Sequence, residues 1–203
     1  MKILLATIIT VGTTSACFGQ GFVDFHNTQN TRISTNGFLQ AAAPVGTWYY
    51  ALLVAPSNQN TIGTNDGSFM GWTFVTLGTN TTTAGRMSGN TTTDGLGVQV
   101  PGYSSLATVD FAVVGWSANL GTDFNTVRAG FHGFDNYGTW NTSPFLGAGW
   151  FGISTVAQDI PLAPDGGPYN TVFGSASRRP RSRPLFLGRN QVSEPHRQWW
   201  CFR

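Results

Sequence analysis

The feature that most constrains the fold of this chain is a series of short apolar runs separated by turn-forming residues. The runs are rich in Val, Phe, Trp, Tyr and Thr, and turn formers such as Pro-Asp-Gly-Gly at 164–167 lie between them. Short β-branched and aromatic runs bounded by Gly, Asn and Asp are typical of β-strands. The predicted strands are residues 21–26, 46–54, 71–77, 96–100, 107–116, 126–131 and 149–156.

The composition is unfavourable for long surface helices, which are rich in Glu, Lys, Ala and Leu. The chain has 26 glycines, but only one lysine and one glutamate. The best helix candidate, residues 117–127, is expected to form a turn or a single helical coil. Residues 48–54 are apolar on both parities, which suits a central strand. We therefore predict an all-β fold, an antiparallel β-sandwich of jelly-roll-like topology with about eight strands.

The first twenty residues have the layout of a secretory signal peptide. Lys2 provides a positive start, an apolar stretch covers residues 3–11, and small residues precede the body. The stretch is too short for a lasting transmembrane helix. We expect residues 1–20 to be a signal peptide cleaved near Gly19, and the mature protein to be secreted or on the cell surface. The alternative is a lipoprotein anchored at Cys17.

Charge divides the chain into an acidic body and a basic tail. Residues 21–177 carry eight aspartates against three arginines, a net charge of −5, whereas residues 178–203 carry seven arginines against Glu194, a net charge of +6. The overall charge of +2 therefore belongs to the tail, and we expect no nucleic-acid partner. We predict a β-sandwich domain over residues 21–174 and a disordered, dispensable tail over residues 175–203.

A polar segment, residues 78–93, repeats the sequence Asn-Thr-Thr-Thr at Asn80 and at Asn90. The ten-residue spacing fits opposite ends of a hairpin or one long polar loop. Two copies do not establish a solenoid, because a solenoid needs at least three stacked repeats.

Four stretches of the body carry a resemblance to a known group of proteins. They are "GFVDFHNT", "PVGTWYYALLVAPS", "GYSSLATVDFAVVGWSANLGT" and "GWFGISTVAQDIPLAPDGGPYNTVFG". Over roughly residues 1–174 the chain resembles the secreted PEP-CTERM sorting-type proteins of Verrucomicrobia and related bacteria. The resemblance implies an exported β-rich body, followed by a Pro-Glu-Pro motif, an apolar membrane helix and an arginine cluster that a sorting protease system reads. It supplies no catalytic residues.

The tail departs from that pattern. Glu194 and Pro195 follow Ser193 instead of a proline, and no apolar run of about 20 residues comes after them. The abrupt change to Arg, Pro and Ser is typical of a reading-frame slip in a GC-rich gene, so we expect the sorting anchor in a shifted frame. The alternatives are a disordered basic arm for anionic polymers or membrane surfaces, and an ordinary solvated tail.

Catalytic and metal-binding patterns are weak in this sequence. The histidines His26, His132 and His196 show no zinc-ligand spacing, and hydrogen bonding at loops or strand ends is the simpler interpretation. A glycosidase needs two carboxylates across a cleft. Asp24 and Asp110 lie within predicted strands, where we interpret them as outward polar positions. We predict no enzymatic activity, no cofactor and no metal site.

Calcium binding by the polar loops is the alternative to the absence of a metal site. Residues 64–68, 90–95 and 133–138 are rich in Asp and Asn, which can supply oxygen ligands. None of these loops follows the EF-hand spacing, and Asp-Gly is foremost a turn signal.

Aromatic residues that are expected to be exposed suggest carbohydrate as a ligand. Carbohydrate-binding modules present exposed aromatic rings, and Trp140 lies beside Tyr137 in the loop "NYGTWNTSP". Three other tryptophans are expected in the core: Trp48, Trp72 and Trp116. We predict a non-enzymatic cell-surface or extracellular-matrix protein. The alternative is a carbohydrate-binding module that uses Trp140 and Tyr137 to bind an extracellular polysaccharide.

Overall fold

The fold is all-β and antiparallel, as the sequence predicts. The computed structural model describes residues 19–34, 46–63, 69–134, 140–142, 150–173, 186–189 and 201–202. The strands are β1 (Gln20–Val23), β2 (Ile33–Ser34), β3 (Trp48–Pro56), β4 (Thr73–Asn80), β5 (Met87–Ser88), β6 (Val98–Ser104), β7 (Thr108–Ser117), β8 (Phe131–Phe134), β9 (Trp140–Thr142), β10 (Trp150–Ile153), β11 (Ala157–Pro161), β12 (Phe186–Arg189) and β13 (Cys201–Phe202).

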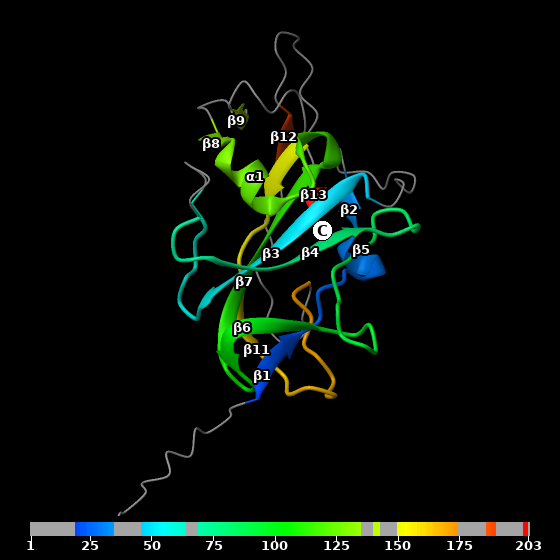
Figure 1. The fold of residues 1–203 in the computed structure, drawn as a ribbon, viewed down its shortest axis with the longest axis vertical. Coiled ribbons are helices and arrows are strands. Elements are labelled where there is room, and N and C mark those ends of the chain that lie inside the picture. Colours follow the sequence, from blue (N-terminus) through cyan, green and yellow to red (C-terminus); the bar gives the residue numbers. More distant parts are fainter. Residues whose placement is uncertain are drawn as a thin grey trace, which may run out of the picture.

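Seven strands form the main sheet, in the order β12-β10-β7-β3-β4-β5, with β11 also paired to β7. The smaller pairs are β1 with β6, β2 with β13, and β8 with β9. Figure 1 shows β8, β9 and β12 at one end of the molecule, and β1, β6 and β11 at the other.

Strands β3 and β7 form the centre of the main sheet. They pair along the whole of β3, from Trp48 opposite Ser117 to Pro56 opposite Val109. Nearly all of their side chains are buried on both faces of the sheet. This confirms the prediction that an apolar run on both parities is a central strand. Burial on both faces requires that each face is covered, because a sheet with one wet face alternates apolar and polar residues.

The pair of β1 and β6 contributes to this cover. Val23, Val98 and Val100 are buried in the same apolar core as the side chains of β3 and β7. Strand β1 closely approaches the chain that follows β11 at Gly21, where a Cβ atom would lie 2.5 Å from the Leu162 Cδ1 atom. Only glycine fits there without a shift of the neighbouring chain. The arrangement is a β-sandwich with one large sheet and one short pair of strands.

The prediction of a strand over residues 126–131 is wrong for most of that range. Residues Phe124–Ala129 form the helix α1, and β8 begins only at Phe131. Asp123 caps α1, because its carboxylate accepts the Thr126 N–H at 2.8 Å. Phe124 and Val127 are buried one helical turn apart. This cap and the i, i+3 apolar spacing outweigh the strand propensity of Thr126 and Val127.

Two short segments of the expected tail are paired with the body. Strand β12 pairs with β10, and β13 pairs with β2. The other residues of 175–203, like the signal region before residue 19, lie outside the described residues, and a disordered tail stays a prediction for them. Within the described part of the chain, no helix has the length and apolar character needed to cross a membrane.

Candidate ligand-binding surface

The two Asn-Thr-Thr-Thr copies open two successive loops beside β5. The first threonine loop, residues 81–86, joins β4 to β5 in a hairpin, and the Thr81 N–H donates to the Arg86 carbonyl at 2.8 Å. The second threonine loop, residues 91–97, follows β5. The hairpin was one of the two arrangements that the repeat spacing predicts.

The asparagine of each copy anchors its loop to a segment that is distant in sequence. The Asn80 Oδ1 atom accepts the Trp48 N–H at 3.2 Å. The Asn90 Oδ1 atom accepts the Phe25 N–H at 2.7 Å, across 65 residues of sequence. A side-chain oxygen that takes a backbone N–H replaces a missing ladder hydrogen bond. Each copy of the repeat therefore supplies one asparagine whose side chain holds its loop in place.

Hydrogen bonds inside the second threonine loop fix its shape. The Thr92 hydroxyl accepts the Gly97 N–H at 2.8 Å, and its oxygen lies 2.6 Å from Asp94 Oδ1. The Leu96 N–H also donates to Asp94 at 3.0 Å. The hydrogen bonds from Thr92 and then from Leu96 hold the pKa of Asp94 below its usual value, because they favour the charged carboxylate. Asp94 is therefore an anion at neutral pH.

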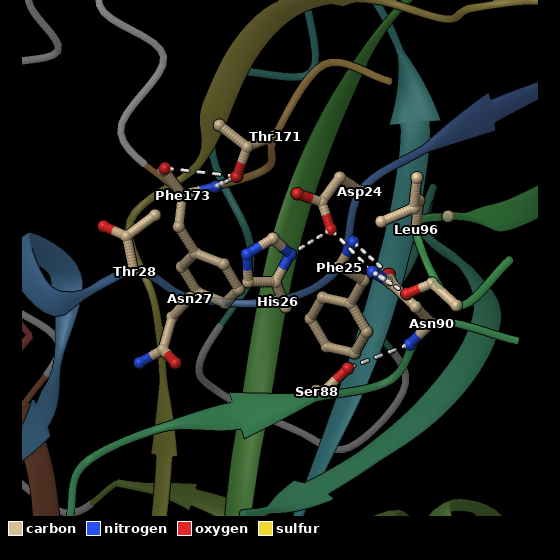
Figure 2. A network of polar contacts seen from close by, with 12 residues as sticks. Asp24, Phe25, His26, Asn27, Thr28, Ser88, Asn90, Leu96, Thr171 and Phe173 are labelled. Atoms are coloured by element: carbon tan, nitrogen blue, oxygen red, sulfur yellow. Dashed lines mark hydrogen bonds and ion pairs between the residues drawn. The ribbon is translucent and has the colours of Figure 1, made fainter. Parts of the chain in front are cut away.

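A polar network joins the second threonine loop to the chain that follows β1 (Figure 2). Asp24 lies between His26 and Asn90 and bonds both, the His26 Nδ1 atom directly and the Asn90 Nδ2 amide at 2.7 Å. The Asp24 side chain is only 13% exposed, whereas the His26 side chain is 36% exposed. The buried carboxylate thus orients a partly exposed imidazole.

A pocket of about 340 Å³ lies between the two threonine loops. We call it the arginine pocket, and its polar lining is His26, Thr81, Thr83, Arg86, Ser88 and Asn90. Hydroxyl, amide, imidazole and guanidinium groups can all donate hydrogen bonds to an oxygen-rich ligand.

A second pocket, of about 360 Å³, shares the second threonine loop. We call it the aspartate pocket, and it is lined by Phe22, Thr91, Thr92, Thr93, Asp94 and Asp165. The Phe22 ring lies 5.8 Å from the Tyr169 ring, centroid to centroid. The Tyr169 hydroxyl in turn donates to Asp165 at 3.2 Å. An aromatic ring next to carboxylates and hydroxyls offers both an apolar surface and hydrogen-bond acceptors.

The interpretation of Asp24 and Asp110 as outward polar positions is wrong. Asp24 is buried in the network described above. Asp110 is 1% exposed, and its Oδ1 atom accepts the Asp159 N–H at 2.7 Å. That bond spans a β-bulge, where β11 loses register with β7 between Ala157 and Ile160. Both aspartates are buried because they bond distant segments, so alternation along a strand could not predict their burial.

The aromatic site predicted at Trp140 and Tyr137 is only partly within the described residues. The backbone of Trp140 begins β9 and lies opposite Phe134 of β8. Its side chain and the whole of Tyr137 lie outside the described residues. Of the tryptophans expected in the core, Trp116 and Trp72 are buried, and Trp48 is half-buried against the core.

Sequence reasoning missed the arginine pocket, although the Asn-Thr-Thr-Thr repeat marks both of the loops that form it. Among the described residues, no three His, Cys, Asp or Glu side chains meet in an arrangement that could hold a metal ion. Comparisons with family models, with curated proteins and with solved structures give no match to this chain.

Proposed function

We propose that this chain is a non-enzymatic, exported protein of the cell surface or extracellular matrix, related to the PEP-CTERM sorting-type proteins. The observation that carries the proposal is the position of β1 relative to the expected cleavage site. Strand β1 begins at Gln20, the residue that cleavage after Gly19 would leave first. Removal of residues 1–19 would therefore leave every residue of β1 in place.

The two carboxylates considered for catalysis support a non-enzymatic role. Asp24 bonds His26 and Asn90, and Asp110 accepts a backbone N–H at a bulge. Each carboxylate thus has a structural use in the fold.

The test of export is the amino terminus of protein recovered outside the inner membrane. We expect a mature chain that begins at Gln20 or Gly21. Full-length protein that keeps Met1 and stays in the cytoplasm would contradict export, and a lipid-modified Cys17 would replace secretion with lipid anchoring. The sorting relationship predicts that a shifted reading frame after Ser177 encodes a Pro-Glu-Pro motif and about 20 apolar residues. An intact gene without such a frame would contradict it.

A second candidate function, carbohydrate binding, is favoured by the two pockets that share the second threonine loop. Hydroxyl, amide and carboxylate groups line them, and Phe22 lines one of them. Sugars are bound by such polar groups together with aromatic rings, which pack on their apolar faces.

Binding to a panel of neutral and acidic polysaccharides tests this function. We expect Asp165→Asn to weaken binding of a neutral glycan in the aspartate pocket. The control is Asp159→Asn, the same chemical change at an exposed residue of β11. Trp140→Ala tests the aromatic site that the sequence predicts. Carbohydrate binding is ruled out for this surface if no polysaccharide in the panel binds.

A further inference from the structure

Arg86 carries a positive charge that its surroundings do not neutralise. Its side chain is half-buried and lines the arginine pocket. Its Nε atom is buried and has no hydrogen-bond partner, and among the described residues Arg86 forms no ion pair with a carboxylate. Because Nε is buried, the terminal N–H groups of the guanidinium are the donors that a ligand in the arginine pocket can reach. An unpaired guanidinium that lines a pocket suits an anionic group.

The first threonine loop holds Arg86 in position. The Arg86 N–H donates to the Thr83 carbonyl at 3.0 Å, and the Arg86 carbonyl accepts from the Thr81 N–H at 2.8 Å. These two bonds hold the backbone of Arg86 beside Thr81 and Thr83, whose hydroxyls belong to the same pocket. A guanidinium on a fixed backbone can bind an oxyanion through two parallel hydrogen bonds.

His26 adds a second nitrogen to the same pocket. Its Nδ1 atom is bonded by Asp24, which leaves Nε2 as the ring nitrogen that can contact a ligand. The hydroxyls of Thr81, Thr83 and Ser88 can each donate or accept a hydrogen bond. The pocket therefore suits a group that carries both an oxyanion and hydroxyls.

The neighbouring aspartate pocket restricts which part of the ligand can carry a negative charge. Asp94 and Asp165 line it, and the body as a whole has a net charge of −5. A second anionic group placed there would meet like charges, which is unfavourable. A neutral sugar could instead use the carboxylates as hydrogen-bond acceptors and the Phe22 ring as an apolar surface. A ligand that spans both pockets therefore needs acidic and neutral units in turn.

From this arrangement we propose that the arginine pocket binds the acidic group of a polysaccharide in which charged and neutral sugars alternate. Arg86 binds the oxyanion, His26 and the threonine hydroxyls contact the same sugar, and the neutral neighbour occupies the aspartate pocket. The proposal rests on carbohydrate binding, the second candidate function, and it specifies the class of polysaccharide.

Binding of the full chain to four polymers of matched length tests this proposal. The polymers are hyaluronan, with alternating acidic and neutral units; polygalacturonate, with a carboxylate on every unit; keratan sulfate, with sulfate as its acidic group; and dextran, which is neutral. We expect hyaluronan or keratan sulfate to bind most tightly, and the preferred one of the two identifies the oxyanion as carboxylate or sulfate. Arg86→Gln should weaken that binding roughly 10- to 100-fold, because a charge-assisted hydrogen bond is lost.

The matched control is Arg128→Gln, which removes the same charge from α1 and should leave binding unchanged. All variants keep the arginine-rich tail. If the charge of the tail alone caused binding, Arg86→Gln and the unmodified chain would bind equally well, and that result would overturn the proposal.

Thr83→Val provides an independent test if Arg86→Gln unfolds, because Thr83 is exposed and valine keeps its shape. A loss of severalfold is expected; unchanged binding would contradict the proposal. Dextran binding without binding of acidic polymers would leave carbohydrate binding intact and exclude this specificity.

Discussion

The centre of the main sheet and the threonine loops are stabilised by different forces. In β3 and β7 most side chains are apolar and buried, and the strands pair in register along the whole of β3. Around the threonine loops, three asparagines provide many of the fixed contacts: Asn27, Asn80 and Asn90. Apolar burial is non-directional and tolerates changes of shape, whereas these hydrogen bonds require particular atoms. The fold therefore depends on the apolar centre, whereas the shape of the candidate binding surface depends on a few side-chain amides.

The largest effect is expected in the centre. Trp116 is fully buried, packs on Phe124 and Tyr49, and donates its Nε1–H to the Gly121 carbonyl at 2.8 Å. We expect Trp116→Ala to lower the free energy of unfolding by about 3–5 kcal/mol, through lost burial and the cavity left behind. Urea unfolding followed by circular dichroism measures it. Leu106→Ala, at a side chain that is 78% exposed, is the control and should change little. Equal effects of the two changes would contradict the assignment of the core.

A slightly smaller effect is expected at the amide that holds the first threonine loop. Asn27 is fully buried; its Nδ2 donates to the carbonyls of Thr31 and Gly85, and its Oδ1 accepts the Met87 N–H. Asn27→Asp keeps the shape but turns the two donor bonds into repulsion between oxygens. We expect a loss of about 2–4 kcal/mol in urea unfolding, since a buried group left without its partner costs about 1–3 kcal/mol.

The control for Asn27 is Asn170→Asp, at an exposed residue whose Nδ2 donates to a single carbonyl, that of Pro161. This change should cost much less than Asn27→Asp. If the two variants were equally stable, hydrogen bonding by Asn27 would not explain the stability of the loop region.

Substitutions of Asp110 test whether a side-chain hydrogen bond also stabilises the centre of the main sheet. Asp110→Ala removes the acceptor of the Asp159 N–H at the bulge, and we expect it to cost about 1–3 kcal/mol. Asp110→Asn keeps an oxygen acceptor in the same place and should stay within about 1 kcal/mol of the unmodified chain. Thermal unfolding of both variants checks the difference. If asparagine proved as harmful as alanine, the negative charge would matter more than the hydrogen bond.

The smallest effect is expected at the cap of α1. Hydrogen bonds from the Thr126 N–H and then the Thr126 hydroxyl hold the pKa of Asp123 below its usual value. A carboxyl with a lowered folded-state pKa stabilises the fold above its unfolded pKa, and that contribution is lost as pH falls through the folded pKa. Asp123→Asn keeps a cap but does not titrate. We therefore expect the stability of the unmodified protein relative to Asp123→Asn to decrease on acidification, as measured by urea unfolding across acidic pH.

The other titrating groups are common to both proteins, so subtracting the two pH profiles isolates Asp123. A difference that stays constant from neutral to acidic pH would show that the carboxylate charge contributes nothing at this cap.

The sequence alone determined the class of fold and the positions of its central strands. Residues 48–56 and 108–117 are long runs that are rich in aromatic and aliphatic residues and mostly apolar on both parities, a pattern that favours the middle of a packed sheet. The helix α1 was also readable in principle, because Asp123 precedes two apolar residues spaced one turn apart. The expected single helical coil within residues 117–127 covers the first residues of α1. Its last residues were assigned to a strand instead, because a short sequence that contains Thr and Val matches a strand as well.

The tertiary structure alone decided which polar residues are buried and which meet at a surface. Asp24 and Asp110 look alike as polar residues within strands, yet each is buried because a backbone or side-chain partner, Asn90 or Asp159, lies against it. His26 and Arg86 are far apart in sequence and share a pocket only because the chain after β1 runs beside β5. Local propensity acts over a few residues, whereas the register between distant segments depends on the packing of the whole core.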